Sequence, residues 1–120
     1  MKRVALIAAA IALLTACMGP VIEAKLLPLS PEQTNEIQAA VAYRLRDPQS
    51  AQFRNIRYIE RTHQSGEVSL LVCGQVNAKN GFGGYAGFSG FTGTFENGGF
   101  KIYGIGDPDN LWIYESSCGA

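Results

Sequence analysis

Hydrophobic and polar residues alternate with two different periods along this chain, and the change of period separates a helical part from a sheet part. Apolar side chains recur every four positions at Ile37, Val41 and Leu45, which predicts an amphipathic helix with one buried face. Ser30 stands where the cap of this helix is expected. The helix should end before Pro48, because the residue that precedes a proline avoids the helical region.

Beyond residue 52 the period falls to two, which is typical of strands with one face in a core. Four such segments are expected, at 53–61, 68–77, 92–95 and 100–105. Asn97-Gly98 lies between the last two and predicts a tight hairpin, since these residues readily adopt positive φ. The tail, 111–118, fits a short helix or a last strand. The pattern as a whole predicts an α+β domain, in which one N-terminal amphipathic helix packs on a small antiparallel sheet of about four strands.

The first residues have another pattern, a charged start followed by an apolar run. Lys2 and Arg3 precede the eleven apolar residues Val4 to Leu14, and small residues lead to Cys17. This order is that of an export signal. The sequence Leu14-Thr15-Ala16-Cys17 resembles a bacterial lipobox, which implies that Cys17 takes a diacylglycerol and becomes the first residue after cleavage.

The lipobox resemblance divides the chain into a signal peptide at 1–16, a lipidated tether at 17–29 and one domain at 30–120. Met18 stands where lipoproteins retained in the inner membrane have Asp. By that analogy we expect the lipid to anchor the protein in the outer membrane, facing the periplasm.

Two other interpretations of the N-terminal segment stay open. The uncharged run from Val4 to Ile22 has nineteen residues, nearly enough for an uncleaved transmembrane anchor, although a glycine and a proline near its end argue against one. An ordinary secretory signal cut after Ala16 would leave Cys17 as a free thiol. All three interpretations predict export.

Exported cysteines are expected to pair, because the compartment is oxidising. Once Cys17 is assigned to lipid, Cys73 and Cys118 remain, and we expect a disulfide between them. It would close a loop of about 45 residues and contribute about 4 kcal/mol by the chain-entropy estimate. A metal site is the competing use of cysteine, but there is no CxxC and His63 is the only histidine. We therefore expect no metal and no cofactor.

Charge and length limit the kinds of partner. The chain has ten basic and ten acidic residues, and loss of Lys2 and Arg3 with the signal leaves eight against ten. No basic run is present, so no nucleic-acid partner is expected. Removal of residues 1–16 from 120 leaves 104 residues, the size of one small domain.

Glycines alternate with aromatic rings over 77–91, NAKNGFGGYAGFSGF. Such a segment either packs its rings on the sheet or presents them to a partner as a stacking surface. The second interpretation makes the loop 81–91 a candidate contact surface through Phe82, Tyr85, Phe88 and Phe91.

Two motifs in the domain carry a second resemblance. Asp47 to Phe53 reads DPQSAQF, and Cys73 to Phe88 reads CGQVNAKNGFGGYAGF. They are similar to the patterns DPxSAxF and CGxVNAKNxFGGYxGF of a group of small exported bacterial and phage-associated proteins of unknown function. The resemblance covers about half of the domain and implies no reaction.

Candidate catalytic groups are few. His63 lies in a polar turn where a surface histidine is expected, and Ser65 beside it does not make a dyad. Asp107 and Asp109 suit a turn better than a calcium loop. We therefore predict no catalytic residue and a non-catalytic envelope lipoprotein that contacts a protein or a cell-wall component. The alternatives are an inhibitor of lysozyme-like or phage attack and a small cell-wall hydrolase.

Overall fold

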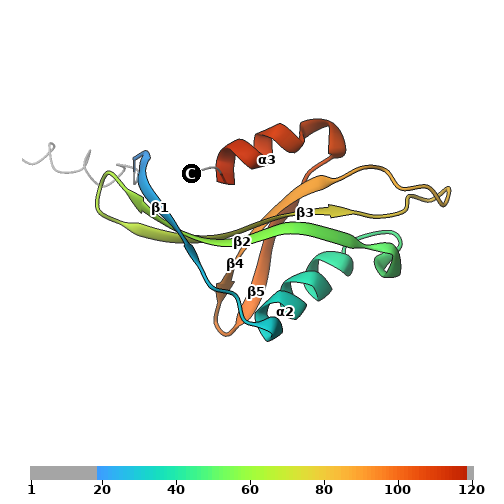
Figure 1. Ribbon diagram of the computed structural model, residues 1–120, viewed down its shortest axis with the longest axis horizontal. Helices are drawn as coiled ribbons and strands as arrows, with labels where there is room; N and C mark the ends of the chain where they lie inside the picture. The colour runs from blue at the N-terminus through green and yellow to red at the C-terminus, as the bar shows by residue number, and fades with distance from the viewer. Residues whose placement is uncertain (1–18, 119–120) are drawn as a thin grey trace, which may run out of the picture.

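The computed structural model describes residues 19–118 as an antiparallel sheet of five strands with an α-helix on each face (Figure 1). The strands lie side by side in the order of the sequence. Their bounds are β1 Val21–Leu27, β2 Gln52–His63, β3 Val68–Asn77, β4 Ser89–Glu96 and β5 Gly99–Ile105. The helices are α2 Pro31–Ala42 and α3 Leu111–Cys118, and two 3-10 turns are η2 Pro48–Ser50 and η3 Pro108–Asn110. The predicted α+β class is confirmed.

The sheet has five strands rather than four, and the helix α2 is not the first element. The additional strand is β1, which pairs with β2 so that Val21 lies opposite His63 and Leu27 opposite Tyr58. Most of its side chains are exposed, because β1 is an edge strand, so no buried alternation marks it in the sequence. Residues 21–27 thus belong to the folded sheet, where a tether was expected.

The helix α2 begins at a capping box. The Ser30 hydroxyl accepts the Gln33 N–H at 3.1 Å, and the Gln33 side-chain oxygen accepts the Ser30 N–H at 2.9 Å. Ile37 and Val41 are completely buried, so the predicted apolar stripe faces the sheet. The helix ends earlier than expected, before Leu45, which reaches the core from the turn that follows.

The main core lies between α2 and the sheet. Phe91 of β4 is completely buried there, and its ring meets the Phe53 ring edge-on with centroids 6.1 Å apart. Gly74 of β3 lies beneath the Phe91 ring, where a β-carbon would collide with it. The buried residues of this core are Ile37, Val41, Val72, Val76 and Phe91.

The strands β4 and β5 form the predicted hairpin. Glu96 and Gly99 are paired, and the two residues between them have positive φ, 54° at Asn97 and 83° at Gly98. These angles are those of the primed turn that matches the twist of antiparallel strands. The Asn97-Gly98 prediction is therefore confirmed.

The opposite face of the sheet carries α3. Cys118 of the helix forms the predicted disulfide with Cys73 of β3. Tyr114 packs directly on Gly90 and Gly106, where a β-carbon at either position would collide with the tyrosine side chain. The C-terminal segment is thus a helix, the first of the two alternatives that the sequence left open.

Candidate functional site

The segment between β3 and β4, residues 78–88, projects from one end of the sheet, and we call it the aromatic loop (Figure 1). Asn80 closes its tip. The Asn80 side-chain oxygen accepts the N–H groups of Phe82 at 2.8 Å and Gly84 at 3.2 Å, and the Asn80 N–H donates to the Gly84 carbonyl at 2.8 Å. Gly83 takes a φ of 85°, which suits glycine. One asparagine thus gives the tip a defined conformation.

The base of the aromatic loop is tied to the turn η2 through Ser50. The Ser50 hydroxyl accepts the Lys79 N–H at 2.8 Å, and the Ser50 carbonyl accepts the Tyr85 hydroxyl at 3.0 Å. Lys79 and Tyr85 also pair with each other as an isolated bridge. The two motifs of the sequence resemblance are therefore in contact, because Ser50 belongs to DPQSAQF and its partners belong to the second motif.

The four aromatic residues predicted as a contact surface have different surroundings. Phe82 is 99% exposed and Tyr85 is 45% exposed. Phe88 is partly buried, with the Arg54 guanidinium carbon 3.6 Å from its ring centroid. Phe91 belongs to β4 and has no exposed surface, so it contributes to the core instead of a contact surface. The exposed part of the candidate surface consists of Phe82 and Tyr85.

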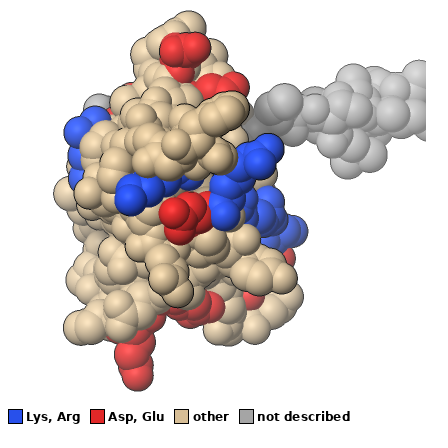
Figure 2. All heavy atoms as spheres, turned by 90° about the vertical axis from the view of Figure 1, so that its right-hand side faces the viewer, with Lys and Arg blue, Asp and Glu red and all other residues tan. Residues whose placement is uncertain are grey.

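Two cationic side chains, Lys79 and Arg46, lie beside the aromatic loop. The Lys79 ammonium lies 5.8 Å from the Tyr85 ring centroid, and an Arg46 guanidinium nitrogen lies 3.7 Å from the place of a β-carbon at Gly81. Figure 2 shows the end of the molecule from which the loop projects, with Lys and Arg atoms across its middle around one acidic group. The arrangement suits a partner that offers an apolar group beside an anionic one.

A charged network, which no sequence motif indicated, lies between the sheet and α3. Gln75 is 6% exposed; its oxygen accepts from Arg54 Nε at 2.6 Å and its nitrogen donates to Glu115 at 2.6 Å. Arg57 completes the network through an ion pair with Glu115 at 3.3 Å. Each charged side chain is engaged by a neighbour, so we assign the network to holding α3 on the sheet.

His63 is buried at the end of β2, and the expectation of a surface histidine is wrong. It is 5% exposed, with Nδ1 3.0 Å from the Gly19 carbonyl oxygen and Nε2 2.8 Å from the Ser69 hydroxyl. Because a carbonyl only accepts, Nδ1 donates to Gly19, and the Ser69 hydroxyl serves Nε2 as donor or acceptor. The serine partner comes from β3, so Ser65 is not the neighbour. Sequence spacing missed the contact because Ser69 reaches His63 only through strand pairing.

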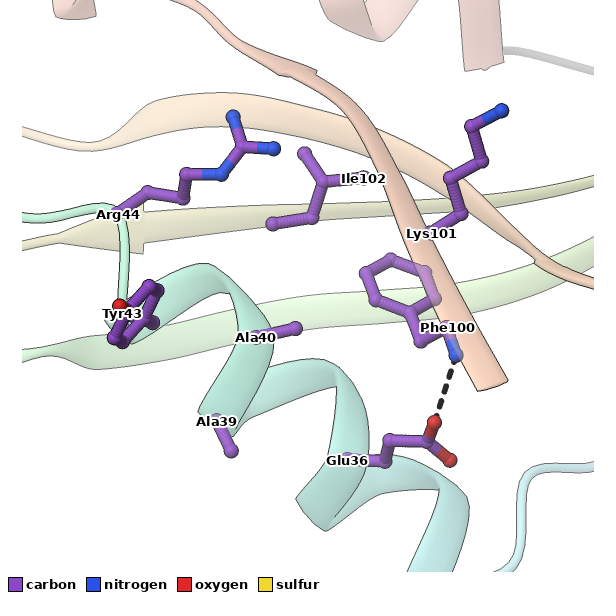
Figure 3. A pocket seen from close by; sticks show the side chains of 8 residues that line it. All are labelled: Glu36, Ala39, Ala40, Tyr43, Arg44, Phe100, Lys101 and Ile102. Atoms are coloured by element: carbon purple, nitrogen blue, oxygen red, sulfur yellow. Dashed lines mark hydrogen bonds between the residues drawn. The ribbon is translucent and has the colours of Figure 1, made fainter. Parts of the chain in front are cut away.

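A groove of about 720 Å³ runs between α2 and β5. Figure 3 shows Ala40 of the helix directed toward Phe100 of the strand, and the Glu36 carboxylate accepting the Phe100 N–H at 2.7 Å. The groove is lined by Glu36, Ala39, Ala40, Tyr43, Arg44, Phe100, Lys101 and Ile102. Its only carboxylate is thus bound to the edge of the sheet, and the lining provides no pair of carboxylates for catalysis.

A smaller hollow of about 340 Å³ lies where β1, β2 and α3 meet. Its lining consists of Ala24, Lys25, Leu26, Asn55, Arg57, Ile59, Glu115 and Cys118. Glu115 is its only carboxylate and is paired with Arg57. Neither hollow includes His63 or Ser69, so the one serine–histidine contact found here does not face either of them.

Residues 19–118 include neither a cluster typical of a metal site nor a helix typical of a membrane span. Within that range no three His, Cys, Asp or Glu side chains are grouped to hold a metal ion, and no helix is long and apolar enough to cross a bilayer. Asp107 serves the turn η3, where its N–H donates to the Asn110 side chain at 2.9 Å. Cys17, the predicted lipidation site, lies outside the described residues.

Comparison with known proteins adds no relative: no protein family, no curated protein and no solved structure matches this chain.

Proposed function

We propose that this protein is a lipid-anchored envelope protein that binds a partner through the aromatic loop and catalyses no reaction. Phe82 carries the proposal, because a large apolar ring is 99% exposed at the tip of a hydrogen-bonded loop. Burying a side chain of this kind is favourable by about 1.5–3 kcal/mol. A partner that covers Phe82 gains that free energy.

The hydrogen bonds that order the loop favour a binding role for the exposed Phe82 ring. Asn80 fixes the tip and Ser50 fixes the base by hydrogen bonds of 2.8 to 3.2 Å. A loop that is ordered before the partner arrives loses little conformational entropy on binding. The backbone that carries the Phe82 ring is thus held in one conformation before a partner binds.

The partner class follows from the charges beside the ring. Lys79 and Arg46 flank the exposed aromatic residues, so an envelope protein or a cell-wall component with an apolar group next to a carboxylate fits the surface. Recognition would combine stacking on Phe82 and Tyr85 with hydrogen bonds from the cations.

The location is proposed from the lipobox at Leu14 to Cys17, with acylation of Cys17 and attachment to the outer membrane on its periplasmic side. The disulfide between Cys73 and Cys118 supports export, because such bonds persist in oxidising compartments. Labelling of cells with radioactive palmitate tests the anchor. Label is expected on the wild-type protein and none on a Cys17→Ser variant.

The binding proposal is tested by photo-crosslinking in intact cells. Benzoylphenylalanine in place of Phe82 should give a discrete adduct, which mass spectrometry identifies. The matched control places it at Tyr103, an exposed aromatic residue of β5 that is 58% exposed. The captured partner must then bind the purified wild-type protein more tightly than the Phe82→Ala variant. Equal adducts at both positions, or equal affinity of both proteins, would refute the proposal.

A further inference from the structure

The start of the described chain is fixed to the sheet at the end opposite the aromatic loop (Figure 1). The Gly19 carbonyl accepts from the buried His63, and the Pro20 carbonyl accepts the Gln64 N–H at 2.8 Å. Ser69 of β3 holds the His63 ring from its other side, so His63 connects Gly19 to the sheet. The described chain is therefore bonded to the sheet from Gly19 onward.

The reach from Gly19 to Cys17 is short. Two residues, even fully extended, span at most about 7 Å. If the Cys17 acyl chains lie in a bilayer, the end of the sheet that holds Gly19 must lie against the headgroups. Only Met18 separates the two residues, which is too little chain for a tether about which the domain could turn freely.

The side chains at this end of the sheet suit a lipid interface. Val21, Ile22 and Val68 are 39%, 64% and 56% exposed. Val21 pairs with His63 and Val68 pairs with Thr62, so the two valines lie at the same end of β2. The segments 19–22 and 63–68 contain no Lys or Arg and one acid, the exposed Glu67, so apolar contact, not attraction to anionic lipids, would hold them at the membrane.

We propose that this end of the sheet, formed by residues 19–22 and 63–68, docks on the phospholipid bilayer and directs the aromatic loop away from it. The inference rests on the lipid anchor of the proposed function. The ten residues of β3 at about 3.3 Å each separate the docking end from the loop by about 33 Å. The aromatic loop, and any partner bound to it, is therefore held at a fixed distance from the membrane.

The test uses the full lipidated protein in phosphatidylcholine vesicles whose acyl chains are brominated, because bromine quenches tryptophan fluorescence only at close range. Trp112 is the only tryptophan and is 69% exposed on α3. In a Trp112→Phe background, a Val68→Trp variant should lose most of its fluorescence and a Phe82→Trp variant should lose none. The wild-type Trp112 should be little affected.

The outcomes separate the inference from the proposed function. Quenching at Trp112 but not at position 68 would show that the domain lies flat on its α3 face, and overturns the inference. Protein that sediments with the vesicles without quenching at position 68 would overturn docking and leave the anchor intact. Failure of the wild-type chain to sediment would remove the anchor and the docking together.

A charge placed in the docking end provides the control. Ile22→Asp alters an exposed side chain, so the sheet should still form. The variant should sediment with the vesicles through its lipid and show a clear loss of quenching at position 68. Unchanged quenching would overturn the assignment of these apolar side chains to the bilayer.

Discussion

The two faces of the sheet are held by different kinds of interaction. Under α2, five completely or nearly completely buried apolar residues form the core, and the rings of Tyr58, Phe95 and Phe100 follow each other edge-on with centroids 5.4 Å apart. Under α3, the buried apolar residues are Ile59, Leu71 and the disulfide cysteines, beside the Tyr114 ring and the charged network of Gln75. The first face excludes water by packing, and the second keeps its helix by specific bonds.

The length of the helices explains the difference. The eight residues of α3 are too few for a helix to be stable alone, and Trp112 and Ile113 of this helix are exposed. The twelve residues of α2 have a cap and a buried stripe. A covalent bond therefore compensates on one face for the apolar area that is available on the other.

The largest expected effect is on the α2 face. Phe91→Ala removes a completely buried ring and should lower the free energy of unfolding by about 3–5 kcal/mol. Urea denaturation followed by circular dichroism measures the change. A loss below about 1 kcal/mol would show that the core under α2 does not carry the stability that its burial indicates.

The next effect is on the α3 face. Replacing Cys73 and Cys118 together by Ala should cost about 3 kcal/mol, within the usual range for a native disulfide. Amide hydrogen exchange should increase most in α3 and least in α2. Equal exchange in both helices would contradict the difference between the two faces.

A smaller effect is expected from the charged network. Glu115→Ala removes the acceptor of the buried Gln75 amide and the ion-pair partner of Arg57, at a cost of about 1–2 kcal/mol. Glu67→Ala is the matched control, because this exposed carboxylate lies in the turn between β2 and β3. Thermal unfolding of the two variants compares them, and equal shifts would show that the network contributes nothing.

The smallest effect is expected outside both faces. Phe82→Ala should change the free energy of unfolding by less than about 0.5 kcal/mol, because the ring is 99% exposed. The same substitution at Phe91 is its matched pair in the same urea series. A destabilisation of more than about 1 kcal/mol would show that Phe82 packs on the protein and is not free for a partner.

Local chemistry explains the features that the sequence predicted correctly. The hairpin turn depends on Asn97 and Gly98 alone, and the start of α2 depends on Ser30 and Pro31. The disulfide followed from an even number of remaining cysteines. Each of these inferences needs only neighbouring residues or a count.

The features that sequence reasoning missed depend on contacts between distant residues. The strand β1 is defined by its pairing with β2, and His63 is buried because Gly19 and Ser69 cover it. Phe82 and Phe91 have similar glycine-rich neighbours in the sequence. Only the start of β4 at Ser89 makes one of them part of the core and leaves the other in water.

The meander order of the strands bears on how the chain is assembled. Each strand pairs with the next one in the sequence, so the sheet can add strands one at a time in chain order through local pairings. The link between Cys73 and Cys118 spans 45 residues and depends on the last described helix. The disulfide therefore connects the middle strand of the meander to the end of the described chain, which the pairing of neighbouring strands alone does not do.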